Sequence, residues 1–325
     1  MTNERPIPPE QATPDELLAR GKDPDLIFQT ELAADVRRAV HAPGTAIELV
    51  APLPPDLTIR YAIFDHDGTI STLRHGWEQI MEPVMMKAIF GRTDPRADPV
   101  VHVRILQQVR EFIDKTTGIQ TLLQMHGLAQ MVRAAGLVPA DEVLDAAGYK
   151  RIYNEALMNL VERRLDRLRS GELGVDDYTM KNAVPFLQRL HAAGIRLYLA
   201  SGTDEADVIR EAEQLGYASL FEGRIYGASH DITHDAKLMV LNRIIGEIGG
   251  EQAAHIVTFG DGPVEIRETR RRGGVTVGLA SNEVQRCGLQ LDKRTRVIRA
   301  GAHLVVPDFS DMDTLLGLLR IGVGV

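Results

Sequence analysis

The chain has 325 residues, of which 44% are hydrophobic, and a formal net charge of −8 at pH 7. This length is enough for about two domains, and acidic charge spread along the chain argues against non-specific binding to nucleic acids or anionic membranes. Cys287 is the only cysteine, which excludes an intramolecular disulfide and a thiolate-based structural zinc site and fits a reducing compartment.

Residues 1–58 are predicted to form a partly helical leader. Its start is proline-rich, the segments TPDELLAR and PDLIFQTELAADVRRAV have helical patterns, and TAIELV near the end is a possible strand. The leader lacks the apolar core of a signal peptide, and no stretch of the chain approaches the roughly 20 apolar residues of a membrane helix, so we expect a cytoplasmic protein. The leader could pack on the rest of the chain, cover one of its faces or mediate a homodimer.

The apolar run YAIF at 61–64 predicts a buried strand, and Asp65 and Asp67 follow it directly. Charge next to buried surface is unfavourable unless it is paired or binds a metal, so two carboxylates at this point indicate a functional site. A bare Asp-Gly turn would explain Asp67 and Gly68 alone. An EF-hand loop is excluded because its sixth position would be Ile70 instead of Gly.

Residues 74–180 have apolar positions three and four apart and predict an α-helical insertion. Its methionines are expected to pack helix faces. Four residues of this insertion are candidates for substrate specificity: three that follow the first strand and its acids, and one in the polar break DKTTG between two helices. They are Arg74, His75, Trp77 and Lys115.

Further strands are predicted at 195–200, 255–259, 275–279 and 303–307. Polar residues follow two of these strands: Ser201, Gly202 and Thr203 follow the strand at 195–200, and Asp261 and Glu265 follow the strand at 255–259. Lys237 lies at the start of a predicted helix between them. Strands that alternate with helices predict an α/β fold. We expect a Rossmann-like three-layer core with a parallel sheet, formed by residues 59–73 and 181–325, and an inserted α-helical domain at 74–180.

In open parallel sheets the ligand site lies at the carboxyl ends of the strands, so these polar residues should share one crevice. Several carboxylates with room for a substrate phosphate suit Mg²⁺. Lys237, Ser201 and helix N-terminal amides could then bind phosphate oxygens. Asp65 could attack phosphorus, and Asp67 could protonate the leaving alkoxide if its surroundings or the bound substrate keep it protonated.

The segments IFDHDGT, LYLASGT, Lys237 and TFGDGPVEI, in this order, resemble the four motifs of the haloacid dehalogenase superfamily. The insertion resembles the C1 cap of its phosphoglycolate phosphatase and β-phosphoglucomutase branch. The resemblance implies that Asp65 is the nucleophile and Asp67 the acid/base, and it implies that Ser201, Gly202 and Lys237 bind phosphate. It also implies a Mg²⁺ site formed by Asp65, the backbone carbonyl of Asp67 and Asp261.

Two positions depart from that pattern or vary within it. Glu265 stands where Asp is more common and would reach the metal directly or through water. His66 occupies the variable position between the two acids and either points away from the phosphate or contacts the leaving group. His66 and Thr203 are further candidates for substrate specificity. His230 and His234 could suggest a zinc pair, but loop histidines without further ligands are more simply polar surface.

The expected function is a Mg²⁺-dependent phosphatase for a small phosphorylated metabolite, such as a sugar or polyol phosphate, with neither nucleic acid nor membrane as partner. Two alternatives remain open at this point. A phosphomutase would use the same residues and return the phosphoryl group to its substrate. A non-catalytic protein would bind a phosphorylated ligand or a protein partner without turnover.

Overall fold

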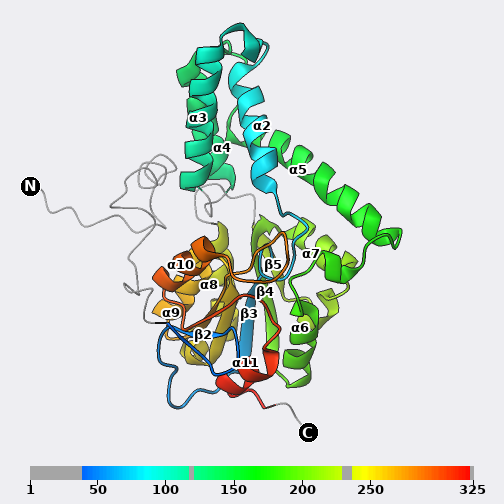
Figure 1. Cartoon of the computed structure of the whole chain (residues 1–325), viewed down its shortest axis with the longest axis vertical. Coiled ribbons are helices and arrows are strands. Elements are labelled where there is room, and N and C mark those ends of the chain that lie inside the picture. Colours follow the sequence, from blue (N-terminus) through cyan, green and yellow to red (C-terminus); the bar gives the residue numbers. More distant parts are fainter. Residues whose placement is uncertain (1–38, 117–120, 229–235, 323–325) are drawn as a thin grey trace, which may run out of the picture. The chain divides into compact units, whose positions relative to one another are not determined.

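The computed structural model describes residues 39–116, 121–228 and 236–322 (Figure 1). The helices predicted in the leader before residue 39 lie outside the described residues, as do His230 and His234. The described chain divides into two compact units. Residues 76–116 and 121–164 form the helical unit, and residues 39–75, 165–228 and 236–322 form the α/β unit.

The α/β unit is built around one sheet, in which the described residues form eight strands in the order β1-β2-β8-β7-β6-β3-β4-β5. The strands are β1 (Val40–His41), β2 (Glu48–Leu49), β3 (Tyr61–Asp65), β4 (Arg196–Asp204), β5 (Ile225–Ala228), β6 (Ile256–Gly260), β7 (Val275–Leu279) and β8 (Leu304–Val306). Strands β3 to β8 pair in parallel, and β1 and β2 pair antiparallel at one edge. The predicted α/β fold with a parallel sheet is therefore confirmed.

Two strands differ from the sequence-based expectation. The pattern around Ile225–Ala228 does not predict β5, because its four residues are interrupted by a glycine and show no alternation, although all four are buried. Val40, predicted at the end of a helix, instead pairs with Leu49 in the β1–β2 hairpin. Strand β5 depends on pairing with β4, and β1 depends on pairing with β2, and local pattern carries little information about such pairing.

Helices cover both faces of the sheet. The helices α6 (Ala183–Ala192) and α7 (Glu205–Gln214) lie on one face, and α8 (Ala236–Ile248), α9 (Pro263–Arg271) and α10 (Leu291–Arg299) lie on the other (Figure 1). The short α11 (Met312–Leu318) follows β8. Right-handed crossovers explain this division, because the chain runs outward through β3, β4 and β5 and then returns to the other side of β3 through β6, β7 and β8.

The reversal of strand order lies between β3 and β6, the point where open α/β sheets form their ligand crevice. Phe64 of β3 stacks on Phe259 of β6, with 4.4 Å between the ring centroids. Both rings are fully buried. The residues that follow these two strands therefore start from a rigid, well-packed base.

The helical unit contains α2 (Trp77–Phe90), α3 (Pro99–Thr116), α4 (Thr121–Ala135) and most of α5 (Ala146–Arg169). Met81, Met85 and Met125 belong to its buried cluster, as predicted for methionines that pack helix faces. One prediction was wrong: helix α3 continues to Thr116, so Lys115 lies in its last turn and not in a break between helices. None of the described helices is both long and apolar enough to cross a membrane.

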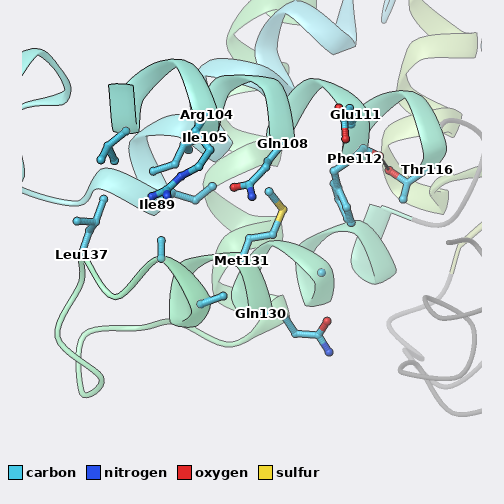
Figure 2. Close-up of a pocket in the computed structure, with 14 residues that line it drawn as sticks. Ile89, Arg104, Ile105, Gln108, Glu111, Phe112, Thr116, Gln130, Met131 and Leu137 are labelled. Atoms are coloured by element: carbon cyan, nitrogen blue, oxygen red, sulfur yellow. Dashed lines mark hydrogen bonds between the residues drawn. The ribbon is translucent and has the colours of Figure 1, made fainter. Parts of the chain in front are cut away.

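A cavity of about 670 Å³ lies within the helical unit, mainly between α3 and α4 (Figure 2). Ile105 and Phe112 of α3 and Met131 of α4 contribute apolar surface to it, and Arg104 and Gln108 contribute polar groups. Among the predicted site residues whose side chains are described, none lines this cavity.

Candidate active site

Three neighbouring parallel strands bring the predicted polar residues together at the carboxyl-terminal end of the sheet. Strand β3 ends at Asp65, which pairs with Ala200 of β4, so Ser201 is the next residue along β4. Strand β6 pairs with β3 on its other side, and Asp261 is the first residue after β6. The parallel register thus gathers residues that are far apart in the sequence.

Asp65, Asp261 and Glu265 form a cluster of acids, each with a carboxylate oxygen within 4.8 Å of the others. Lys237, in the first turn of α8, places its Nζ 2.6 Å from Asp65 Oδ1 and 3.2 Å from Glu265 Oε2. Burial raises the pKa of Asp65 well above its usual value, and the Lys237 ammonium acts in the opposite direction. Clustered carboxylate oxygens are the donors that Mg²⁺ prefers, so this set of residues fits a magnesium ion.

Glu265 reaches the cluster by folding back from the first turn of α9. Its Oε1 accepts a hydrogen bond of 2.7 Å from the backbone N–H of Gly262, which caps the helix. A Cβ atom at Gly260 would lie 2.3 Å from the same Oε1, so the space that this carboxylate occupies exists because residue 260 is glycine. The glycines on either side of Asp261 therefore make room for Glu265.

The turn after Asp65 depends on Gly68. Its φ of +75° lies in the left-handed region, and its N–H donates to the carbonyl of Ser71 at 2.9 Å. A Cβ atom at Gly68 would lie 2.4 Å from Asp261 Oδ2. The turn therefore needs glycine both for its backbone conformation and for its close approach to Asp261.

Asp67 is surrounded by groups that favour its ionised form. Its Oδ2 accepts a hydrogen bond of 3.0 Å from Thr203 Oγ1, and its Oδ1 lies 3.4 Å from His66 Nδ1 and 3.9 Å from Arg74 Nε. Burial acts to raise the pKa of Asp67, but His66, Arg74 and Thr203 outweigh it and lower that pKa to about 2. The expectation that the surroundings keep Asp67 protonated is thus wrong, and only the bound substrate remains as a source of protonation.

His66 and Arg74 belong to a buried polar network around Asp67. The His66 ring is fully buried, and its Nε2 hydrogen bonds to Tyr217 Oη at 2.7 Å. Arg74 binds both oxygens of the fully buried Glu211, with Nη2–Oε1 at 2.7 Å and Nε–Oε2 at 3.3 Å. His66, Asp67 and Glu211 also have the spacing of a metal site, but the Arg74 guanidinium already supplies the positive charge there.

Sequence reasoning missed Glu211 and Tyr217. A signal for Glu211 is present, because it lies in α7 among Val208 and Ala212, which form the buried side of that helix. An acid on the apolar side of an amphipathic helix is unusual unless it is paired. Tyr217 follows the same helix and carries no such signal.

Lys293 and Glu283 were missed as well. Lys293 Nζ donates to Asp261 Oδ2 at 2.6 Å and to Glu283 Oε1 at 2.5 Å. Burial acts to raise the pKa of Asp261, but the Lys293 ammonium outweighs it, so that pKa is lowered. The segment LDKRTRVIR, which contains Lys293, has the composition of a solvated basic helix. Its position after the loop that follows β7 is the one feature of the sequence that indicates a place near the site.

The remaining predicted residues are spread over both units. Ser201 and Thr203 belong to β4, where the Thr203 N–H donates to Ser201 Oγ at 3.0 Å, and Gly202 between them is exposed.

His75 Nδ1 lies 3.6 Å from Glu283 Oε2. Trp77 begins α2 and packs against the buried cluster of the helical unit. The Lys115 side chain lies outside the described part of the chain.

Comparison with known families identifies one match over most of the chain. The family described as hydrolase, haloacid dehalogenase-like hydrolase, matches residues 59–271. This range contains the acid cluster, Lys237 and the network around Asp67. A sequence comparison with curated proteins finds no match.

Two solved structures illustrate the similarity in fold. A predicted phosphoglycolate phosphatase from Haemophilus somnus 129pt has a TM-score of 0.53 and 13% sequence identity, over 79% of this chain and 97% of that chain. A β-phosphoglucomutase from Clostridium difficile has a TM-score of 0.53 and 15% identity, over 81% of this chain and 98% of that chain. At these identities the similarity concerns the fold.

Proposed function

The chain belongs to the haloacid dehalogenase-like hydrolases, and from this we propose that it is a Mg²⁺-dependent phosphatase that hydrolyses a small-metabolite phosphate monoester through an aspartyl-phosphate on Asp65. The observation that carries the proposal is the acid cluster of Asp65, Asp261 and Glu265 with the Lys237 ammonium on two of its members. In this proposal the insertion at 74–180 is the cap domain.

Asp65, Asp261 and Glu265, with the backbone carbonyl of Asp67, would hold Mg²⁺, and the bound ion would offset the charge of the substrate phosphate. Lys237 supplies a second positive charge at the same carboxylates. The Ser201 hydroxyl accepts a bond from Thr203 N–H and can still donate its own proton to a phosphate oxygen.

In the first step, a carboxylate oxygen of Asp65 bonds to phosphorus while the bond to the leaving alkoxide breaks, and Asp67 donates its proton to that alkoxide. In the second step, Asp67 takes a proton from water as the water oxygen attacks phosphorus, which releases phosphate and restores Asp65. Because Asp67 has a pKa of about 2 without substrate, the negative charge of the arriving phosphate has to raise its proton affinity.

A phosphate-release assay tests this proposal. The panel contains sugar and polyol phosphates, and it includes phosphoglycolate and β-glucose 1-phosphate because of the two structural neighbours. We expect release from a few compounds in Mg²⁺, no release in EDTA and no release by Asp65→Asn. Asp56→Asn, which changes an exposed acid, serves as the control and should retain activity.

Three outcomes would contradict or redirect the proposal. Release that persists in EDTA or in Asp65→Asn would contradict the mechanism. Conversion of one sugar phosphate to its isomer without net phosphate release would identify the phosphomutase alternative, which uses the same residues. Ligand binding without any turnover would favour the non-catalytic alternative.

A further inference from the structure

We propose that Lys293, held in place by Glu283, is a positioning residue that orients Asp261 for Mg²⁺. The inference rests on the proposed function, because it takes Asp261 to be a ligand of the ion. It assigns a role to two residues outside the four motifs and outside the range matched by the family.

The geometry is that of a chain of charged side chains that ends on the metal ligand. Lys293 Nζ lies 2.6 Å from Asp261 Oδ2 and 2.5 Å from Glu283 Oε1. The other oxygen of Glu283 lies 3.6 Å from His75 Nδ1. Lys293 is 8% exposed, unlike the surface lysines whose ion pairs contribute little.

Both members of the pair are fixed by local structure. The side chain of Asn282 accepts hydrogen bonds from backbone N–H groups two and three residues further on, which orders the loop that carries Glu283. Lys293 lies in the first turn of α10, and its backbone N–H donates to the side chain of Gln290, the N-cap residue. Both side chains therefore extend from ordered backbone, and Lys293 contacts Asp261.

An ammonium on one oxygen of Asp261 has a definite consequence for the other oxygen. The contact with Lys293 at Oδ2 fixes the rotation of the carboxylate and leaves its other oxygen, Oδ1, available for a metal ion. Outer groups that orient a metal ligand in this way typically change metal affinity 10- to 100-fold when they are removed. A positive charge near a metal site also repels the ion, but Glu283 at 2.5 Å offsets the charge of Lys293.

The test is a calorimetric titration of Mg²⁺ into the full chain without substrate. We expect Lys293→Met to raise the Kd for Mg²⁺ about 10-fold or more, because Asp261 loses its orientation. The isosteric Glu283→Gln should raise the Kd as well, because Glu283 then no longer offsets the charge of Lys293, which repels the ion more strongly. Arg299→Met removes one positive charge from the exposed end of the same helix and should leave the Kd unchanged.

Thermal unfolding in EDTA identifies any variant that no longer folds. If Lys293→Met does not fold, the Kd of Glu283→Gln decides the test. An unchanged or lower Kd for Mg²⁺ in the deciding variant would overturn the inference and leave the proposed function intact. A wild-type chain that binds no Mg²⁺ would overturn both.

Discussion

The ammonium of Lys237 lies 2.6 Å from Oδ1 of Asp65, and both residues are largely buried. The same ammonium also contacts Glu265 at 3.2 Å, so one cation joins the proposed nucleophile to a proposed metal ligand. Three acids within 4.8 Å of one another would repel strongly without it. Lys237 therefore holds this cluster together when Mg²⁺ is absent.

Replacement of Lys237 should weaken both stability and activity. Lys237→Met leaves buried carboxylates uncompensated, so we expect the free energy of unfolding in EDTA to fall by about 3 kcal/mol. We also expect kcat/KM to fall by about 100-fold or more, because a positive charge at the reaction centre is lost. Urea denaturation and steady-state assays measure the two effects. Lys181→Met, at an exposed lysine, is the control, and equal urea midpoints for the two variants would contradict the prediction.

Gly68 offers a comparison between two glycines with the same backbone conformation. In Gly68→Ala the new Cβ atom would lie 2.4 Å from Asp261 Oδ2, which is too close. In Gly194→Ala, at a similar φ of +78°, the new Cβ atom has no other atom within 4 Å. Both variants carry left-handed strain of about 1 kcal/mol. Only Gly68→Ala should also raise the Kd for Mg²⁺ and lower kcat.

Calorimetry with Mg²⁺ and a phosphatase assay distinguish the two variants. Equal Mg²⁺ affinity in Gly68→Ala and Gly194→Ala would show that the close approach of this turn to Asp261 has no role in metal binding.

Removal of one partner of the Arg74–Glu211 pair should destabilise the α/β unit. Glu211 is fully buried, so Arg74→Gln leaves an uncompensated charge and should lower the free energy of unfolding by about 3–5 kcal/mol. The double variant Arg74→Gln with Glu211→Gln removes both charges and should recover part of that loss.

The control is Arg271→Gln, which breaks the more exposed contact with Glu268 at 3.1 Å and should change stability little. Denaturant titration of the four proteins, including the wild type, measures the loss of stability and its recovery in the double variant. A double variant no more stable than Arg74→Gln would mean that the buried charge is not the cause.

His303 should make the fold less stable in acid. Burial, and then the nearby Arg270, lower the pKa of this 5%-exposed histidine to about 3, whereas an unfolded chain has a histidine pKa of about 6.5. The unfolded state therefore binds more protons, and stability falls as the pH drops from about 6.5 towards 3. The contribution of His303 should fall by about 2 kcal/mol between pH 7 and pH 5.

His303→Asn keeps an acceptor for the Thr276 N–H and does not titrate, so its stability should depend less on pH in this range. Urea midpoints at pH 7, 6 and 5 measure the effect, with His41→Asn at an exposed position as the control. Parallel pH profiles of wild type and His303→Asn would refute the assignment.

Much of the fold could be predicted because its information is local. Each strand from 61–64 to 303–307 is a short apolar run next to glycine or polar residues, and the helices between them have regular apolar spacing. Strand β5 could not be predicted in this way, since its four residues become a strand only by pairing with β4. The same holds for β1, which exists by pairing with β2, whereas β2 itself lies within the predicted strand TAIELV.

The amino-acid pattern alone predicts an α/β fold with a parallel sheet and places Asp65, Ser201 and Asp261 after three of its strands, whose carboxyl ends lie at the same end of the sheet. Which charged side chains meet there depends on tertiary packing. Lys293 lies 32 positions from Asp261 and Arg74 lies 137 positions from Glu211, and both contacts arise where packing brings helices against loops. The ionised state of Asp67 depends on such contacts, because a pKa responds to the charges and burial around the group and not to its neighbours in sequence alone.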